Sequence, residues 1–562
     1  MRHWLRSYPR AWRAIRLIRR WYSARFGAYP EWRDVLDSGA VDLLQSRRRS
    51  VRRQKILLAT SIGSYAHATT LESALAASLT LRGADVHVFL CDGVLPACAE
   101  CEASLYPNLR AFVEHGPSRD LCRDCFWPSA NTYTALGVKI HRYSEYLTVK
   151  DRERAAHLAA STPVSAISTL CVDGIPIGEH VFAGALRFFA TGSLEGEPHS
   201  EPVLRRYLHA GLLTAFATRR LLQEQRFESV TLTHGIYIPW GIIGEVARQA
   251  GSRVITWNVA YRKRRLIFSH DDTYHHTLLS EPVQSWEHLE LTVDNDRQLT
   301  DYLVSRREGL FDWIVFHRPS QQSPDEVVKR LSLDTAKPTI GLLTNVSWDA
   351  QLHYPANAFP NMLQWLVATC HYFAGRPDLQ LVIRVHPAEI SGFPVSRQPI
   401  LRELSRRIPQ LASNITVIPP ESDISTYALM ATCNAVIIYG TKMGVELTSI
   451  GIPVIVAGEA WIRGKGITFD ATCPEDYRAL LDCLPMSQRM SLEMIRRARR
   501  YAFHFFFRRM IPVSFIKPKA GFPVFVMHLR KLMELEPGAH KGLDVICDGI
   551  LKGSPFVYDE PS

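Results

Sequence analysis

The sequence predicts an α/β protein with two Rossmann-like domains, and three observations support this fold class. Apolar runs of strand length alternate with helical patterns over residues 54–320, and a second such series covers residues 335–486. This alternation is typical of parallel sheets with helices on both faces. The chain has 562 residues, more than one hydrophobic core usually serves. A polar, proline-containing segment at 319–325 lies between the two series and predicts a linker.

Residues 1–53 form a basic, aromatic-rich arm. Pro9 suits a first helical turn and Gly27 a C-terminal cap, so a helix is expected between them. At about 100° per residue, one face carries apolar residues and the opposite face carries arginines: Trp12, Ile15, Ile18, Tyr22 and Phe26 against Arg10, Arg13, Arg16 and Arg20. This pattern favours an amphipathic helix on an anionic membrane surface. The alternative is a helix packed on its own protein, with the basic face in solvent.

The first domain, 54–320, opens with a β-α-β unit. A buried parallel strand at 55–61 is followed by a helix at 69–82 and a strand at 86–90. Similar units follow with a strand at 229–233, a helix at 240–250 and a strand at 253–258. We therefore expect a parallel sheet in this domain.

A cysteine-rich insertion at 91–125 interrupts the first domain. It contains two CxxC pairs, Cys98 with Cys101 and Cys122 with Cys125. Their spacing matches a four-thiolate module, so the favoured interpretation is a structural zinc ion. An iron–sulfur cluster, with Cys91 as an additional nearby thiol, and free cysteines are the less favoured alternatives.

The second domain, 335–486, reads as a doubly wound parallel sheet. The predicted strands and helices alternate regularly: strands at 339–343, 379–385, 415–418 and 435–438, and helices at 360–373, 400–408 and 425–432. The remaining 487–562 form a basic, helical tail.

The strand at 379–385 ends in Arg384, Val385, His386 and Pro387. Proline cannot donate the next ladder hydrogen bond, so His386 is expected at the carboxyl edge of the sheet. Ligands of open α/β sheets bind at that edge. A histidine there can hydrogen-bond a phosphate while Arg384 supplies positive charge. A chance His-Pro pair at a strand end is the alternative.

A second loop follows the strand that ends near 439 and contains Gly440, Thr441, Lys442 and Gly444. Glycines, a threonine hydroxyl and a helix N-terminus together favour phosphate binding. Glu446, one turn into the helix, could accept hydrogen bonds from ribose hydroxyls. Alternatively the loop is a capping turn, and Glu446 belongs to a structural ion pair.

A third segment, 461–468, carries Arg463 and Lys465 between glycines. Basic side chains on such a loop suit contacts with a diphosphate or an anionic acceptor. We therefore include both residues among the candidate donor-binding residues.

Several runs of this sequence match motifs of a known family: Asn345-Val-Ser-Trp-Asp-Ala, Arg384-Val-His-Pro-Ala-Glu, Asn414-Ile-Thr-Val-Ile-Pro-Pro, Ser425-Thr-Tyr, Tyr439-Gly-Thr-Lys-Met-Gly-Val-Glu and Arg463-Gly-Lys-Gly. Together they resemble bacterial capsule polysaccharide biosynthesis proteins, a family that includes the Kdo transferases. The likeness covers roughly residues 335–480. It is looser in the first domain, through His234-Gly-Ile-Tyr, Trp257-Asn-Val-Ala-Tyr-Arg and Asp272-Thr-Tyr-His.

The resemblance implies a GT-B-like glycosyltransferase in which two Rossmann-like domains face a cleft. The donor, a nucleotide-sugar, would bind the second domain, the acceptor would bind the first, and transfer would need no metal. In related CMP-sugar transferases a His-Pro motif and a serine pair bind the donor phosphate. His386 and Pro387 match the first motif, whereas Gly440 and Thr441 stand in place of the serine pair.

A transferase also needs a base for the acceptor hydroxyl. Asp272, His276 and His234 are the candidates in the first domain, although each is individually more typical of a loop or core residue. His275 is a further polar neighbour, and Asp349 could lie at the cleft mouth or cap a helix.

The composition fits this function. A formal charge of +11 and a pI near 9.1 favour anionic partners. No apolar run is long enough to span a membrane, and the N-terminus lacks the features of a secretory signal. We expect a cytoplasmic protein, peripheral on the inner membrane, with a glycan or glycolipid acceptor and capsule assembly proteins as partners. Nucleic acid is disfavoured, because the basic residues concentrate in the N-terminal helix rather than around the cysteines.

Three alternatives to transfer remain. On the same scaffold the chain could be a nucleotide-sugar epimerase or a polyol-phosphate transferase. From a different class, it could be a non-catalytic, zinc-containing scaffold in capsule assembly.

Overall fold

The computed structural model describes residues 14, 15, 18, 21, 22, 29–48, 54–106, 108–309, 311–313, 315, 322–350, 352, 355–392, 394–520 and 523–559. The predicted amphipathic helix between Pro9 and Gly27 lies almost entirely outside these residues. None of the helices in the described part combines the length and apolar character that crossing a membrane requires.

The chain folds into two compact units. Unit 1 contains residues 1–189, 193–274 and 509–562, and unit 2 contains 190–192 and 275–508. The sequence placed the boundary between 320 and 335, whereas the chain enters unit 2 at 275 and returns to unit 1 at 509. The segment from 275 to 320 was expected in the first domain but belongs to unit 2. The predicted tail is divided, with 487–508 in unit 2 and 509–562 in unit 1.

Unit 1 is built on a seven-stranded sheet of order β15-β8-β7-β6-β1-β2-β3. Its strands are β1 (Lys55–Ser61), β2 (Asp85–Leu90), β3 (Lys139–Arg142), β6 (Ser229–Thr233), β7 (Arg253–Val259), β8 (Arg265–His270) and β15 (Ile511–Pro512). β1, β2, β6 and β7 are the predicted parallel strands, and β3, which was not predicted, is parallel to β2. β8 pairs antiparallel with β7, and β15 pairs antiparallel with β8. Two short hairpins, β4 (Cys171–Val172) with β5 (Ile175–Pro176) and β16 (Ile516–Pro518) with β17 (Phe525–Met527), complete the strands of this unit.

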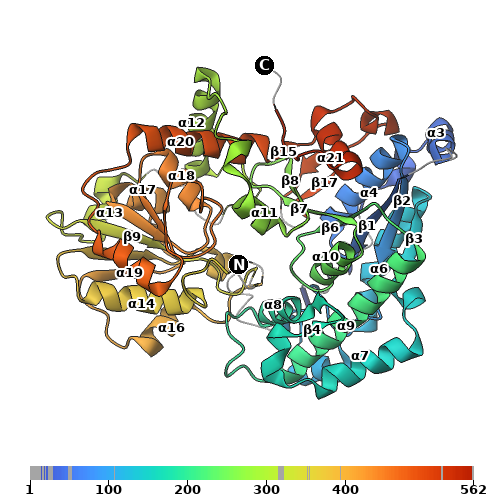
Figure 1. Cartoon of the computed structure of the whole chain (residues 1–562), viewed down its shortest axis with the longest axis horizontal. Coiled ribbons are helices and arrows are strands. Elements are labelled where there is room, and N and C mark those ends of the chain that lie inside the picture. Colours follow the sequence, from blue (N-terminus) through green and yellow to red (C-terminus); the bar gives the residue numbers. More distant parts are fainter. Residues whose placement is uncertain are drawn as a thin grey trace. The chain divides into compact units, whose positions relative to one another are not determined.

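Helices cover both faces of this sheet (Figure 1). α4 (Ala66–Leu81) contacts α6 (Arg119–Ala135) and α21 (Lys541–Lys552), whereas α10 (Trp240–Gln249) contacts α9 (Ser200–Glu224) and α8 (Ile177–Phe189). The other helices of the unit are α3 (Ser38–Arg48), α5 (Leu109–His115) and α7 (Val149–Ser161). All but one of the residues of α4 are buried, in line with its position between sheet and neighbouring helices.

Unit 2 is built on a six-stranded, wholly parallel sheet of order β11-β10-β9-β12-β13-β14. The strands are β9 (Thr339–Leu343), β10 (Gln380–Arg384), β11 (Ile415–Ile418), β12 (Ala435–Ile438), β13 (Val454–Val456) and β14 (Phe469–Asp470). β9 to β12 occupy the positions predicted from the sequence, because short, mainly apolar runs between turn residues are typical of strands buried in a parallel sheet.

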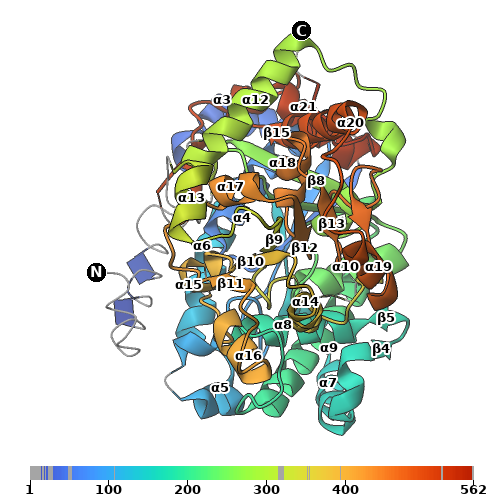
Figure 2. The same ribbon diagram turned by 90° about the vertical axis from the view of Figure 1, so that its left-hand side faces the viewer.

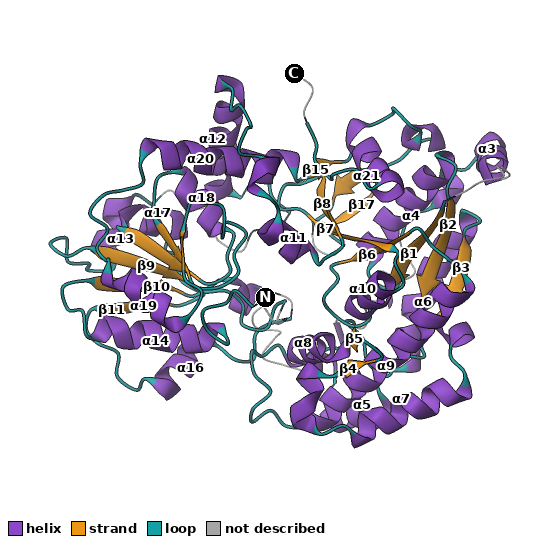
Figure 3. Cartoon of the chain, in the orientation of Figure 1, coloured by secondary structure: helices purple, strands orange, loops and turns teal. Residues whose placement is uncertain are grey.

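The helices of unit 2 are α11 (Tyr274–Ser280, shared with unit 1 at its first residue), α12 (Val293–Glu308), α13 (Pro324–Arg330), α14 (Met362–Ala374), α15 (Ala388–Ser391), α16 (Ile400–Arg407), α17 (Thr426–Thr432), α18 (Met443–Ser449), α19 (Pro474–Asp482) and α20 (Leu492–Phe503). Their starts follow local capping rules: Asn361 caps α14 and Ser425 caps α17 through side-chain bonds to backbone N–H groups. Figure 3 shows these helices around the strands of the sheet.

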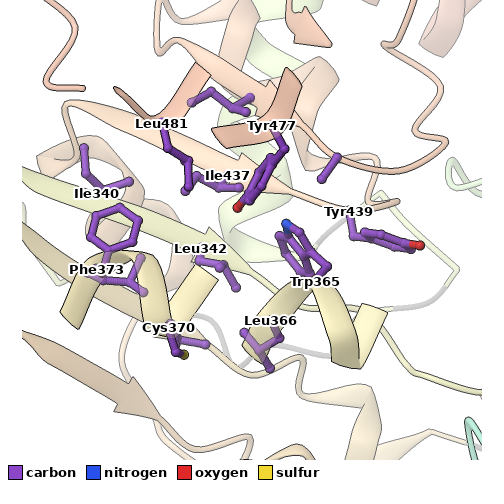
Figure 4. Packing of buried hydrophobic residues seen from close by; sticks show 14 of the residues in the cluster. Ile340, Leu342, Trp365, Leu366, Cys370, Phe373, Ile437, Tyr439, Tyr477 and Leu481 are labelled. Carbon is purple, nitrogen blue, oxygen red and sulfur yellow. The ribbon is translucent and has the colours of Figure 1, made fainter. Parts of the chain in front are cut away.

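One face of the unit 2 sheet carries a large apolar core beneath α14, α16 and α19. Trp365 and Phe373 of α14 and Tyr477 of α19 pack against Ile340 and Ile437 of the sheet (Figure 4). The opposite face packs against α17 and α18, and α18 in turn contacts α20 (Figure 2). This core fixes the sheet whose carboxyl edge carries the predicted phosphate loops.

Candidate active site

The strand order of the unit 2 sheet reverses at β9. β10 and β11 follow on one side of β9, and β12, β13 and β14 on the other. In open parallel sheets, ligands bind outside the carboxyl ends of the strands at such a reversal. The loops after β9, β10 and β12 therefore define the candidate site, and they contain the two predicted phosphate turns.

His386 lies in the loop after β10. Its backbone N–H donates to Thr344 Oγ1 at 3.0 Å, which joins this loop to the one after β9. Its Nδ1 accepts from the backbone N–H of Ala388 at 3.0 Å, so the neutral ring carries its proton on Nε2. Burial and the nearby charges of Lys442 and Arg384 lower the pKa of His386 to about 4. At neutral pH the ring is an uncharged hydrogen-bond donor.

The turn at 440–442 lies beside the same edge. Asn345 Nδ2 donates to the carbonyl oxygen of Gly440 at 2.9 Å, which ties the loop after β12 to the loop after β9. Thr441 Oγ1 accepts from the backbone N–H of Met443 at 3.3 Å. Since Thr344 and Asn345 are adjacent and bond to His386 and Gly440 respectively, the two predicted phosphate turns meet at the loop after β9.

Gly444 has a packing role. A Cβ atom added there would lie 2.8 Å from both Ile438 Cδ1 and Ile462 Cγ2. Only glycine therefore lets α18 approach β12 this closely. Gly444 therefore has a packing role, and its predicted contact with phosphate stays a prediction.

Glu446 is buried between two cations. Its Oε1 lies 2.7 Å from Lys442 Nζ, and its Oε2 lies 2.9 Å from Arg306 Nε and accepts from the Tyr427 hydroxyl at 2.8 Å. Burial raises the pKa of Glu446, but the charges of Arg306 and Lys442 outweigh it and lower the pKa to about 2. Asp312 also pairs with Arg306. Of the two roles left open by the sequence, the geometry favours the structural ion pair.

The guanidinium of Arg384 is hydrogen-bonded to the loop after β11. Its guanidinium donates to the carbonyl oxygens of Pro419 and Ser422, the latter at 3.0 Å, and to Thr426 Oγ1 at 3.4 Å. It is 3% exposed, so it contributes charge near His386 rather than a direct contact with a ligand.

Arg463 and Lys465 also point inward. Arg463 donates to the carbonyl oxygens of Gly458 and Ala471, and Lys465 Nζ donates to those of Leu279 at 3.0 Å and Glu281 at 2.7 Å. Buried carbonyl groups need donors, and these long side chains supply them. This structural role corrects the predicted contact of both residues with diphosphate.

His276 belongs to unit 2, not to the first domain as predicted. Its Nε2 lies 3.1 Å from Glu459 Oε2. Glu459 follows β13, and its carbonyl oxygen would lie 3.5 Å from a Cβ atom on Gly440. His276 and Glu459 are therefore neighbours of the turn at 440–442.

His234 and Asp272 lie in unit 1. His234 follows β6 with a φ of 63°, an uncommon left-handed conformation, and its N–H donates to the carbonyl oxygen of Trp257 at 3.0 Å. A Cβ atom on the next residue, Gly235, would lie 3.5 Å from Thr273 Cα. The structure thus brings the His234 turn next to the Asp272 segment, and it assigns His276 to the other unit.

The predicted cysteines gather in unit 1. Cys98 is hydrogen-bonded to Cys101, and this bond and burial raise the pKa of Cys98. Burial and the neighbouring Cys98, Cys91 and Cys125 raise the pKa of Cys122. Within the described ranges, however, no group of three or more metal-ligating side chains is arranged to hold an ion. The structure thus supports a thiol cluster that includes Cys91.

A groove of about 350 Å³ lies elsewhere in unit 2. Pro338, Thr339, Asn434 and Arg489 line it, at the amino ends of β9 and β12. It is therefore at the opposite edge of the sheet from the two phosphate turns.

Sequence reasoning missed Arg306 and Glu459. Arg306 lies far from Glu446 in the chain, and nothing in the spacing links the two. Glu459 carried a weak signal, because it directly follows the glycine after the buried strand β13, at the ligand edge of the sheet.

Residues 316–487 match the sequence model of the family described as capsule polysaccharide biosynthesis protein. The resemblance predicted from the motifs is confirmed over this part of the chain. No curated protein matches the sequence.

Similar solved structures include two of KpsC from Thermosulfurimonas dismutans. The β-Kdo 2,4-transferase has 15% identity and a TM-score of 0.31, with 49% of this chain and 79% of that chain covered. The β-Kdo 2,7-transferase has 12% identity and a TM-score of 0.32, with 57% and 88% covered. S. aureus MnaA, solved with UDP, has 10% identity and a TM-score of 0.27, with 80% and 91% covered. At these TM-scores the likenesses say nothing about activity.

Proposed function

We propose, from the match of residues 316–487 to the capsule polysaccharide biosynthesis family, that this protein is a glycosyltransferase. It moves a sugar from a nucleotide-sugar donor onto a capsule or other surface polysaccharide. Unit 2 binds the donor, and unit 1 supplies acceptor contacts through the His234 and Asp272 turns.

One structural observation supports this proposal: His386 and Gly440 come from different loops, and both are hydrogen-bonded to the loop after β9, at the carboxyl edge where the strand order reverses. A nucleotide leaving group needs positive charge and directed hydrogen-bond donors. Lys442 offers an ammonium group, and His386 offers an Nε2–H at neutral pH. Thr441 adds a hydroxyl on the same turn.

Transfer in this proposal needs no metal ion at the donor phosphates. The ammonium group of Lys442 offsets the phosphate charge, and burial keeps water from weakening the interaction. Glu446 pairs with Lys442 at 2.7 Å, so the ammonium group is held at the start of α18, next to the turn, before the donor arrives. Glu446 is therefore a positioning residue in this account.

The donor nucleotide is open, and a CMP conjugate is the first candidate. Incubation of the full chain with CMP-Kdo, CMP-sialic acid and UDP-sugars, with surface polysaccharide of the source bacterium as acceptor, tests the function. Free nucleotide and an extended glycan are expected. An isomerised nucleotide-sugar would instead establish an epimerase, and transfer of polyol phosphate would establish that third activity.

Two variants link the activity to the site. His386→Ala and Lys442→Met should each lower transfer at least about 100-fold, as loss of a donor aimed at developing charge does. His371→Ala, an exposed histidine of α14, is the matched control and should retain activity. Unchanged glycan synthesis in both site variants would favour the scaffold alternative.

We also propose that the cysteine cluster binds a structural zinc ion through Cys98, Cys101, Cys122 and Cys125. The clustering of the thiols supports this, although the sulfurs would have to move closer to reach about 2.3 Å from a common ion. Elemental analysis of the purified protein tests it. Less than half an equivalent of any transition metal would contradict zinc and iron–sulfur alike.

Finally, we propose that the basic arm at 1–53 holds the protein on the inner membrane surface. Arginine and aromatic content support this, since each basic residue near an anionic leaflet adds about 1 kcal/mol. Deleting 1–27 should move the protein to the soluble fraction. An unchanged distribution would contradict membrane binding by the arm.

A further inference from the structure

His276 and Glu459 form a histidine–carboxylate pair beside the candidate donor site. Their Nε2 and Oε2 atoms lie 3.1 Å apart, and the side chains are 27% and 9% exposed. Glu459 is itself fixed on both sides: its Oε1 accepts from the backbone N–H of Ala356 at 3.0 Å, and its own N–H donates to Asn357 Oδ1 at 2.8 Å. The carboxylate is thus held in place, while the histidine keeps access to solvent.

The short helix α11, which carries His276, is anchored by side chains of the segment after β13. Trp461 Nε1 donates to the carbonyl oxygen of His275 at 3.0 Å, and the two rings stack with centroids 5.5 Å apart. Lys465 binds the carbonyl oxygens at the far end of the helix, at Leu279 and Glu281. The basic segment expected to bind diphosphate therefore holds His276 against Glu459.

The pair lies next to the proposed phosphate turn. The carbonyl oxygen of Glu459 would be 3.5 Å from a Cβ atom on Gly440, and Asn345 reaches the carbonyl oxygen of Gly440. The backbone of Glu459 therefore borders the turn that would hold the donor phosphate, and the pair lies at the same edge of the sheet as the proposed donor site. No residue of unit 1 is needed for this geometry.

We propose that His276 is the general base that takes the proton of the acceptor hydroxyl, and that Glu459 orients its ring. This inference rests on the proposed glycosyltransferase function. Nε2 lies 3.1 Å from Glu459 Oε2, so in this proposal Nε2 keeps its proton and Nδ1 carries the lone pair. The acceptor O–H proton moves to Nδ1, the oxygen bonds to the anomeric carbon, and the bond from that carbon to the phosphate oxygen breaks. Its electron pair leaves with the nucleotide, and the imidazolium formed is stabilised by Glu459.

The test separates base chemistry from donor binding in the full chain. His276→Ala and His276→Gln should lower the rate of transfer about 100- to 10,000-fold, the usual contribution of a general base. Binding of the donor nucleotide should change less than about threefold. Added imidazole should restore part of the activity of His276→Ala but not of His276→Gln, where the side chain fills the space. A structural role would give no such rescue.

Glu459→Gln keeps the shape of the side chain but removes its charge. It should lower the transfer rate about tenfold or more with the fold and donor binding intact, because an imidazolium without its carboxylate is less stable. Glu475→Gln, an exposed residue of α19, is the control.

The outcomes are distinguishable. Full transfer by His276→Ala and His276→Gln overturns the inference and leaves the proposed function standing. If both variants lose nucleotide binding as well as transfer, the inference is also overturned, since His276 would then bind the donor. If the wild-type protein transfers no sugar from any donor tested, the proposed function fails and this role fails with it.

Discussion

The sequence allowed two roles for Glu446, a contact with ribose hydroxyls or a structural ion pair, and the structure has it between two cations. Glu446 is 4% exposed and contacts Lys442, Arg306 and Tyr427. From the sequence, a carboxylate one turn after a glycine loop suits a ribose hydroxyl as well as it suits an ion pair. The decisive residue, Arg306, comes from α12, so tertiary contact alone could choose between the two.

Replacing Glu446 with alanine should destabilise the protein. The change leaves Arg306 and Lys442 buried with less opposing charge, and breaking a buried ion pair costs about 3–5 kcal/mol. Urea unfolding followed by tryptophan fluorescence measures the change. Glu308→Ala, an exposed position of the same α12, should change the free energy of unfolding by less than about 0.5 kcal/mol. A loss under about 1 kcal/mol in Glu446→Ala would contradict the buried network.

The roles of Arg463 and Lys465 also depend on tertiary contacts that the sequence does not reveal. Their glycine-flanked sequence predicts a loop, and the structure has one, but the side chains bind backbone carbonyl groups inside unit 2. Sequence gives residue type and loop position; it does not give the direction of a long side chain. His386 could be placed more securely, because Pro387 ends the strand and fixes the edge.

At the scale of elements, the strands and helices around the donor site were predictable and their packing was not. β9, β11 and β12 have the predicted residues, since buried strands of four or five apolar residues leave little choice. The close approach of α18 to β12 depends on Gly444, which the sequence suggested for phosphate. Glycine suits both the close packing of a helix on a strand and the close approach of a phosphate. Only the neighbouring side chains distinguish the two roles.

A methyl group at Gly444 tests this packing. Gly444→Ala should destabilise unit 2 by about 1–3 kcal/mol, because the new Cβ atom would lie 2.8 Å from Ile438 and Ile462. Gly375→Ala is the matched control, since its Cβ atom would meet only a carbonyl oxygen at 3.4 Å. Thermal unfolding of the two variants measures the difference. Equal melting temperatures would contradict the proposed packing role.

A histidine pair links β2 and β3 in unit 1. His141 Nε2 and His87 Nδ1 lie 2.8 Å apart, His141 Nδ1 contacts the Tyr146 hydroxyl, and His87 lies 3.3 Å from Asp85. Burial, then the positive charge of His87 and Lys139, lowers the pKa of His141 to about 3. The folded protein therefore holds this ring neutral at pH values where an unfolded histidine takes up a proton.

This pair predicts loss of stability in acid. Because the pKa of His141 is near 6.5 when unfolded and about 3 when folded, its contribution is present above pH 6.5 and declines as the pH falls. At pH 5 the loss from this residue is no more than about 2 kcal/mol. Urea unfolding at pH 7.5 and pH 5 should show a smaller acid effect in His141→Gln than in wild type and His371→Gln. Equal acid effects in all three would contradict the assignment.

At the scale of the whole molecule, the order of segments along the chain does not follow the two units. The chain leaves unit 1 at 274 and returns at 509, where β15 pairs with β8 and α21 packs near α4. The alternation of strands and helices predicted two sheets correctly. It could not predict that the last segment completes the first sheet, because a two-residue antiparallel strand leaves no periodic signal. The cleft expected between the domains stays a prediction.

Removing residues 509–562 should therefore damage unit 1 rather than trim a tail. The truncation would expose the edge of β8 and the apolar surface beneath Leu543, Ile546 and Ile550, all fully buried. We expect aggregation, or rapid proteolysis within 54–274, by comparison with a chain shortened only by residues 560–562. A truncated protein that stays soluble and resists protease would contradict the division of the chain into these units.

The central claim is that the turns at 386 and 440–442 form one donor-phosphate site at the carboxyl edge of the unit 2 sheet. Calorimetric titration of CMP, CDP, UDP and GDP into wild-type protein, His386→Ala, Lys442→Met and His371→Ala tests it most directly. At least one nucleotide should bind wild type and His371→Ala with the same affinity, and binding should weaken at least about tenfold, or roughly 1.4 kcal/mol, in each site variant. Equal binding of that nucleotide by all four proteins would contradict the account.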